Sequence, residues 1–341
     1  MKKLNYLLLG AAALAMASCS QNNDVDAPKG ETGNFHITVN MPEIAGTRAF
    51  GDGYTANNLH YAVYDADNNN RFVSEGQTTF PTNQLWTTVD FQLAYGKNYV
   101  IVFFAQSATS DTNKAYTFSA EDHYVYVDYS KMASNYNQDY YDCFFRAYET
   151  GMLTNESQDA TITLYRPVAQ VNWGVSDIQA EMVTHSGAYG QNAHYLVSQV
   201  SGQAYTIFDM LLTNDDDEVV GGPIGASKEI TLAYLNRPTG QAFPYEPADY
   251  EYLSMQYLLV PAESSTVDLT LTISNKGTAA NPNPEATTRT MNVVVPNTPV
   301  QANYRTNIFG DLLTGDLNFK IVKEPAFNTP DYDVPVPAPG E

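Results

Sequence analysis

The sequence predicts an all-β protein with two β-sandwiches in tandem. Tyr (25) and Phe (15) are abundant, and Val and Thr are frequent, a composition that favours strands over a helical bundle. Short alternating segments are separated by turn residues, as in sandwiches. The 341 residues exceed what one core usually fills, and two cysteines make no disulfide framework, so we expect two large hydrophobic cores.

The N-terminus has the form of a secretory signal. Lys2 and Lys3 precede an apolar run, Leu7–Ala17, that is too short to cross a bilayer, and small residues lead to Cys19. A cysteine in this place resembles the lipidation site of a bacterial lipoprotein signal, whereas a plain secretory signal would make it incidental. We expect residues 1–18 to be removed and Cys19 to carry acyl chains, such as palmitate, in the outer membrane.

The charge excludes one class of partner. Loss of residues 1–18 removes two lysines and no acid, which lowers the formal net charge from −21 to −23. Nucleic acids require clustered Lys and Arg, so we expect no nucleic-acid partner. Attachment to a membrane would depend on lipid at Cys19 rather than on charge.

The first domain is expected over residues 34–165, after a polar tether at 19–33. Phe35, Ile37, Val39 and Met41 alternate with polar residues, which predicts a half-buried strand. The other strands predicted here are Leu59–Tyr64, Arg71–Val73, Val89–Leu93, the fully apolar and therefore central Tyr99–Ala105, and Thr161–Tyr165.

An acidic loop connects the second and third of these strands. Asp65, Asp67 and Asn69 have the spacing of calcium ligands, but Asn70 and Gly76 stand where an EF-hand loop needs Gly and Glu. Asn and Asp tolerate left-handed backbone, so the loop is interpreted as a hairpin tip. The second acidic loop, Asp215–Glu218, has no ligand pattern either. No metal site is predicted.

The second domain is expected over residues 166–325. The strands predicted here are Val168–Trp173, Tyr205–Leu211, Glu229–Leu235, Tyr252–Val260, Thr266–Ser274, Thr288–Val295, Tyr304–Leu312 and Leu317–Val322, with a helix near Val175–Val183. The tail at 326–341 follows Pro325 and holds four further prolines, so an extended segment is expected.

Catalytic motifs are absent from the sequence. The five histidines are scattered, and no His-Glu-x-x-His, Cys-x-x-Cys, Gly-x-Ser-x-Gly or phosphate-loop spacing occurs. We therefore expect no enzyme, no catalytic residue and no cofactor. Six tyrosines between residues 124 and 141 suggest either a glycan-stacking surface or ordinary aromatic packing (Tyr124, Tyr126, Tyr129, Tyr136, Tyr140 and Tyr141).

Several segments resemble landmarks of one family. Gly46-Thr47-Arg48-Ala49 follows the first strand, and a basic residue among small ones suits a protease. Further landmarks are Tyr61–Asp65, Asp142–Phe145, Arg166–Val171 and Tyr304–Gly310. Together with Cys19 they resemble the fimbrillin-like lipoproteins of Bacteroidetes, the type V pilins. That resemblance implies two transthyretin-like β-sandwich domains and cleavage between Arg48 and Ala49 by an Arg-specific protease.

Removal of the first strand would have a physical consequence. Loss of Phe35–Met41 would expose a groove and an unpaired sheet edge, which a strand of a neighbouring subunit can fill. Leu317, Phe319 and Ile321 alternate and could belong to such a donor, although the tail prolines would interrupt its ladder. The sequence thus predicts a surface subunit or accessory protein of a fimbria, at a tip, anchor or shaft. A monomeric glycan-binding lipoprotein is the alternative.

Overall fold

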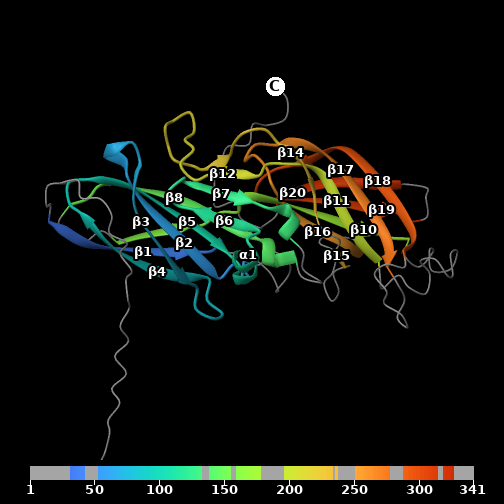
Figure 1. Ribbon diagram of the computed structural model, residues 1–341, viewed down its shortest axis with the longest axis horizontal. Coiled ribbons are helices and arrows are strands. Elements are labelled where there is room, and N and C mark those ends of the chain that lie inside the picture. Colours follow the sequence, from blue (N-terminus) through green and yellow to red (C-terminus); the bar gives the residue numbers. More distant parts are fainter. Residues whose placement is uncertain are drawn as a thin grey trace, which may run out of the picture.

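The computed structural model describes residues 31–42, 53–132, 138–154, 159–177, 196–232, 235–236, 250–276, 287–313 and 318–325. Strands dominate these residues, and their helices are short, which confirms the all-β prediction. The molecule is elongated, with the N-terminal strands at one end and the C-terminal strands at the other (Figure 1).

Two sheets form the N-terminal sandwich. Sheet A has the order β4-β1-β9 and sheet B the order β3-β2-β5-β8. Apolar residues of sheet A and one face of sheet B share a single buried cluster, so the two sheets pack face to face. The strands are β1 (Thr32–Asn40), β2 (Asn58–Asp65), β3 (Arg71–Thr79), β4 (Trp86–Ala94), β5 (Asn98–Gln106), β8 (Cys143–Met152) and β9 (Asp159–Thr163).

Strand β5 explains the continuous apolar run predicted as a central strand. It lies inside sheet B, and every residue from Tyr99 to Gln106 is buried. Its outward face packs into a second cluster, so sheet B is covered on both sides. The β2–β3 hairpin has the predicted tip, where the short helix η1 (Ala66–Asn68) is followed by Asn69 and Asn70 at φ of 53° and 51°.

Two further sheets form the C-terminal sandwich. Sheet D has the order β16-β10-β19-β20, and sheet E the order β14-β11-β17-β18 with β15 beside β11. Trp173 of sheet D and Leu271 of sheet E belong to one buried cluster. The strands are β10 (Val168–Val175), β11 (Leu196–Ala204), β14 (Lys228–Thr231), β15 (Leu235–Asn236), β16 (Glu251–Leu259), β17 (Ser265–Lys276), β18 (Thr287–Val300), β19 (Tyr304–Asp311) and β20 (Asn318–Pro325).

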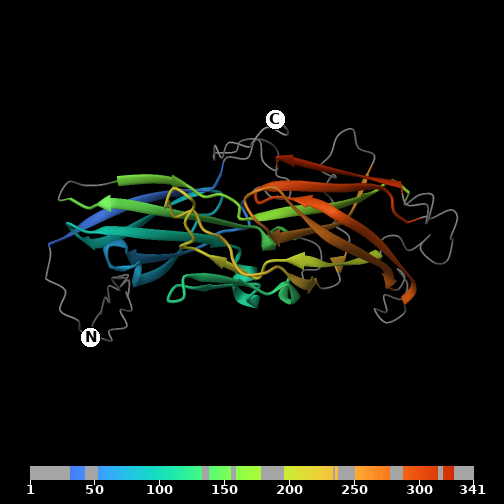
Figure 2. The ribbon, with the colours of Figure 1, turned by 90° about the horizontal axis from the view of Figure 1, so that it is seen from above.

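A fifth sheet connects the two ends. Sheet C has the order β13-β12-β7-β6, and it combines strands from before and after residue 166. Its strands are β6 (Tyr116–Ser119), β7 (Tyr124–Val127), β12 (Ile207–Asp209) and β13 (Gly222–Pro223). It lies over the middle of the molecule (Figure 2). The division at 165/166 between two domains stays a prediction.

The sequence did not reveal every element. No strand was predicted at β6, β7, β8, β11 or β13, and no helical segment at α1 (Ala108–Asn113), η2 (Tyr129–Lys131) or η3 (Gln138–Tyr141). The predicted helix begins at Val175, which is instead the last residue of β10, and from residue 178 it lies outside the described residues.

Candidate functional site

The candidate site is the position that β1 occupies in sheet A, named here the β1 slot. β1 is the central strand, antiparallel to β4 and parallel to β9. Ile37 lies opposite Val89 on one side and Ala160 on the other. Because β1 separates its two neighbours, its removal would leave the edges of both β4 and β9 without their partner.

One face of β1 is part of the hydrophobic core. Phe35, Ile37, Val39 and Met41 are each at most 3 % exposed, and all four belong to the cluster between sheets A and B. The Phe35 ring stacks on Tyr148 of β8, with 6.2 Å between centroids. Burial of such side chains stabilises by about 1.5–3 kcal/mol each, so the β1 slot is a deep apolar groove when empty.

The other face of β1 carries a histidine between two acids. His36 lies opposite Asp90 of β4 and Asp159 of β9, and its Nδ1 is 2.5 Å from Asp90 Oδ1. The hydrogen bond to Asp90 raises the pKa of His36, with a further contribution from the charge of Asp159. A protonated His36 therefore interacts favourably with both flanking strands.

The C-terminal end of β1 is fixed to the body by backbone hydrogen bonds. Met41 N donates to Leu85 O at 2.7 Å, and Leu164 N donates to Asn40 O at 2.8 Å. Residues 43–52 lie outside the described residues, and they include the predicted cleavage site at Arg48 and Ala49. Cys19 lies outside them as well. A break anywhere in 43–52 would leave β1 held without a covalent link to the body.

The candidate donor residues lie in the last strand. Phe319 and Ile321 belong to β20, which pairs with β19 at one edge of sheet D, and both side chains are half-buried. Leu317 lies outside the described residues. β20 thus contributes less to the core than β1 does, and the two candidate segments belong to opposite ends of the molecule (Figure 1).

Two of the sequence landmarks meet at the junction of the two ends. Arg166 Nε and Nη2 donate to Asp142 Oδ1 and Oδ2 at 2.5 and 2.6 Å, and both side chains are fully buried. The guanidinium also lies 4.6 Å from the ring centroid of Phe144. Burial raises the pKa of Asp142, and the adjacent Arg166 opposes that effect. The sequence showed no sign that these residues form a pair.

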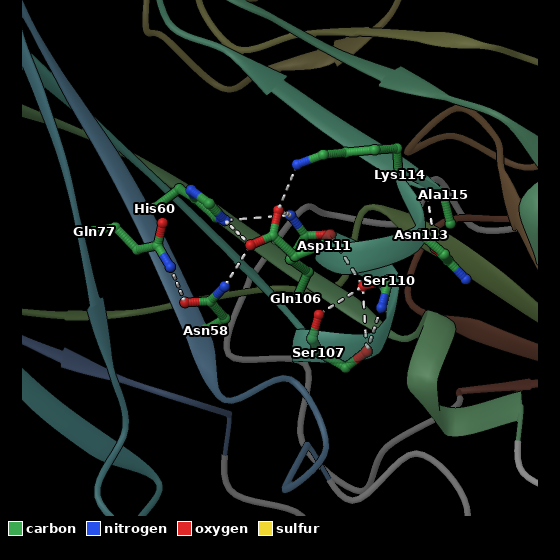
Figure 3. Close-up of polar contacts among 10 residues, drawn as sticks. All are labelled: Asn58, His60, Gln77, Gln106, Ser107, Ser110, Asp111, Asn113, Lys114 and Ala115. Atoms are coloured by element: carbon green, nitrogen blue, oxygen red, sulfur yellow. Dashed lines mark hydrogen bonds and ion pairs between the residues drawn. The ribbon is translucent and has the colours of Figure 1, made fainter.

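Among the described residues, the arrangement most similar to a catalytic site is a polar cluster formed by β2 and the residues around α1 (Figure 3). Asp111 accepts hydrogen bonds from Asn58 and Gln106, and its Oδ2 lies 3.5 Å from His60 Nε2. Burial lowers the pKa of His60.

The serines of this cluster serve the helix rather than the histidine. Ser107 Oγ caps α1 by accepting from Ser110 N, and Ser110 Oγ donates to Gln106 Oε1. These contacts hold α1 against sheet B, so we interpret the cluster as structural.

The tyrosine-rich segment does not form one aromatic surface. Tyr129 and Tyr141 are buried, at 4 % and 1 % exposed, and Tyr136 lies outside the described residues. Tyr124 and Tyr126 stand together on β7, with centroids 6.0 Å apart, and Tyr126 and Tyr140 are exposed. Two of the six tyrosines are therefore core residues.

Neither a metal site nor a membrane helix occurs in the part of the chain that the structure describes. No three His, Cys, Asp or Glu side chains gather there as metal ligands would. No helix within the same ranges combines the length and the apolar character needed to span a bilayer.

The pairing of β1 with β9 is the feature of the site that sequence reasoning missed. The strand at 161–165 was predicted, but not its place beside β1, more than a hundred residues earlier. Parallel pairing between such distant segments leaves no local signal, and only the alternation of Phe35–Met41 indicated that this segment is buried on one face.

Comparison with known proteins gives a family and a set of similar structures. The profile of a family of unknown function, DUF6562, matches residues 27–337, so the chain belongs to that family. No curated protein matches it.

Among solved structures, the chain is similar to the tip fimbrial protein Mfa3 of Porphyromonas gingivalis, with C-terminal truncation, at 12 % identity and a TM-score of 0.44, covering 85 % of this chain and 99 % of that one. It is also similar to a fimbrial assembly protein of Parabacteroides distasonis, at 12 % identity and a TM-score of 0.43, covering 86 % and 96 %. A putative polysaccharide-binding protein of Bacteroides thetaiotaomicron matches at 11 % identity and 0.42, covering 86 % and 96 %.

Fimbrial proteins are thus among the structures similar to this chain, as the sequence resemblance predicted. TM-scores below 0.5 at such low identity do not transfer a function. The β1 slot is therefore the feature from which a function can be inferred.

Proposed function

We propose that this member of the DUF6562 family is a cell-surface fimbrial subunit or accessory protein that exchanges β1 for a strand of a neighbouring subunit. The chain is delivered as a lipoprotein, held in the outer membrane through Cys19, and is cut between Arg48 and Ala49. The cut turns β1 from a covalent part of the body into a removable strand. Residues 19–48 then leave with the lipid.

The observation that carries this proposal is the central position of β1. A strand at a sheet edge could be lost with little effect, but β1 has ladders to both β4 and β9 and fills the core with four buried side chains. An empty β1 slot would expose two strand edges and a large apolar groove, which favours its capture of another extended segment.

The strand most suited to enter the slot comes from the C-terminal region. β20 is a terminal strand at a sheet edge, and Phe319 and Ile321 alternate with the exposed Lys320. Pro325 ends that strand, because proline cannot donate to a ladder. A donor segment from Leu317 to Glu324 would be one residue shorter than β1, and the prolines beyond it restrict the subunit to a short donor.

The proposal is tested by proteolysis of the purified protein without its signal segment. We expect an arginine-specific protease to create a new N-terminus at Ala49, followed by oligomers that form a ladder on a denaturing gel without heating. Arg48→Ala should prevent both the cut and the ladder. Arg71→Ala removes an exposed arginine of β3 and should change neither.

A second pair of variants addresses the slot itself. Ile37 is fully buried, so Ile37→Ala should weaken retention of β1 by about 2–5 kcal/mol and speed the formation of oligomers after the cut. Thr38→Ala alters the face of β1 that points away from the core, and it should change the retention of β1 and the rate of oligomer formation only slightly. If cleavage at Arg48 releases β1 and the body stays monomeric at all concentrations, strand exchange is wrong.

A pair of tyrosines on β7 favours a second candidate function. The exposed Tyr126 lies edge-on to the half-buried Tyr124, and the exposed ring can stack on a sugar ring. An intact, acylated monomer that binds polysaccharide, and loses binding in Tyr126→Ala, would support the glycan-binding alternative over the fimbrial one.

A further inference from the structure

A cavity of about 330 Å³ opens where sheets C and D meet. Its walls are mainly apolar and aromatic, and they come from both ends of the molecule: Tyr165, Phe208, Val220, Pro223, Ala302 and Tyr304. Phe208 belongs to the buried core, and Tyr165 donates a hydrogen bond to Val220 O, so these walls are held in place. Cavities of this size and character typically bind an apolar group.

The cavity keeps its depth through a glycine. Gly221 lies in its wall at a φ of +65°, and a Cβ there would stand 2.5 Å from the Phe145 ring and 2.9 Å from Phe208. A larger residue at 221 would therefore displace the aromatic floor. The backbone at Gly221 can pack this closely against Phe145 and Phe208 because it carries no side chain.

The described chain ends at the mouth of this cavity. In the β19–β20 ladder, Pro325 lies opposite Tyr304, which is itself a wall residue. β20 runs antiparallel to β19, so an extension of this ladder by residues past Pro325 would lie opposite 301–303, the turn before β19. Gln301, Ala302 and Asn303 all line the cavity. Pro325, to which residues 326–341 are joined, therefore lies beside the opening.

The chemistry of those residues suits the cavity. Phe327 is two positions beyond Pro325, so at about 3.1 Å per residue an extended chain would allow it to reach roughly 6 Å from Pro325. Pro330, Pro335, Pro337 and Pro339 follow, and proline-rich segments bind aromatic-lined grooves with little loss of entropy. Three acids and no Lys or Arg lie in 326–341.

Lys323 lies close to the rim and could interact with this acidic segment. Lys323 Nζ lies 5.3 Å from the ring centroid of Tyr304 and donates to Ser264 Oγ and Gln301 Oε1 at 2.7 and 2.9 Å. Glu263 is an exposed acid on the same rim and opposes it. The apolar side chain of Phe327 is therefore expected to supply most of the affinity of the C-terminal segment for the cavity, and charge contributes little.

We propose that the C-terminal segment 326–341 folds back onto its own chain and places Phe327 in this cavity, with its prolines along the rim. The segment then clamps β20 onto sheet D and bridges the two ends of the molecule. This goes beyond the proposed function and does not depend on it, since it concerns the intact chain.

Photo-crosslinking in the full-length chain tests the proposal. p-Benzoylphenylalanine at position 327 should crosslink within one chain to peptides that contain 220–223 or 301–304. The same group at Val73, which is exposed on β3 near the tip of the β2–β3 hairpin, should not reach those peptides. Crosslinks from 327 to other regions would overturn the proposal. Crosslinked dimers would also overturn it, because they would assign the cavity to the tail of a second copy.

Binding of a synthetic peptide provides the second test. A chain that ends at Pro325 should bind the 326–341 peptide with a dissociation constant below about 1 mM, the effective concentration of a short tether. Phe327→Ala in the peptide should weaken binding tenfold or more, the loss expected for one buried phenyl ring. Tyr332→Ala, the matched control, should weaken it less than threefold.

The full-length chain should bind the added peptide at least tenfold more weakly, because its own tail fills the cavity. Ala262→Trp should fill the cavity from the rim and prevent peptide binding. Should the truncated chain fail to fold, Phe327→Ala in the full-length chain replaces it, with increased fluorescence of the apolar dye anilinonaphthalene sulfonate as the expected result. The proposal is refuted if the full-length wild-type and Phe327→Ala chains bind the dye equally. It is also refuted if the wild-type and Phe327→Ala peptides bind with equal affinity.

Discussion

Single residues set the junction between the two ends, and the clearest case is Arg166 with Asp142. The two groups form a bidentate pair at 2.5 and 2.6 Å with no exposed side-chain surface. Both were visible in the sequence only as parts of separate motifs. Their pairing could not be predicted, because it depends on how β8 and the segment before β10 approach each other in three dimensions.

Breaking this pair should destabilise the protein strongly. Arg166→Met leaves Asp142 buried without its partner, and we expect the free energy of unfolding to fall by about 3–5 kcal/mol in urea titrations. The double variant Asp142→Leu with Arg166→Met should recover most of that loss, because it leaves no uncompensated charge. If the free energy of unfolding of Arg166→Met lies within about 1 kcal/mol of the wild-type value, water already reaches the pair.

At the scale of elements, the sequence predicted strands well where large side chains alternate or run together. β1 and β5 followed from such patterns. β11 did not, because its inward positions are small: Ser198, Val200, Gly202 and Ala204. A Cβ on Gly202 would stand 2.4 Å from Asp268 O, so β11 packs closely against β17 at this point. Such packing requires small residues, and β11 therefore lacks the alternation of large apolar residues by which a strand is predicted. The face of β1 was therefore predictable, and its partners were not.

Retention of β1 should depend on pH through His36. The pKa of His36 is raised in the folded state, so its contribution to holding β1 is fully present below its ordinary pKa of about 6.5 and is lost as the pH rises through the raised value. With a specific protease site introduced in 43–52, the cleaved β1 segment should dissociate more slowly near pH 6 than near pH 8, as followed by size exclusion.

His36→Gln removes the titrating group and should abolish this difference. The matched variant His60→Gln should retain it, since His60 lies in sheet B and the pKa of His60 is lowered by burial. A wild-type dissociation rate that is the same at both pH values would contradict a role for His36.

At the scale of the whole molecule, sheet C makes the two sandwiches one structure. β7 and β12 pair across the predicted domain boundary, and Tyr129 contributes further contacts: its hydroxyl donates to Tyr205 O and accepts from Leu259 N, both at 2.9 Å. His123 Nδ1 also lies 2.9 Å from Asp209 Oδ1. Two sandwiches were predictable from length and pattern, but the sheet between them was not.

We therefore expect one cooperative unfolding transition. Circular dichroism and calorimetry should give coincident midpoints and a calorimetric enthalpy equal to the van't Hoff enthalpy. An isolated 166–325 fragment should be far less stable, because β12 would lack β7 and Arg166 would lack Asp142. Two separate transitions in the intact chain would show that the sandwiches fold independently.

The central place of β1 also has a mechanical consequence. Most strands run roughly along the long axis of the molecule (Figure 2). A pull along that axis loads the two ladders of β1 in shear, so hydrogen bonds on both sides must break together rather than one after another. A strand that replaced β1 in the slot would be loaded in shear in the same way. Its resistance to dissociation under force would therefore be greater than its equilibrium affinity suggests.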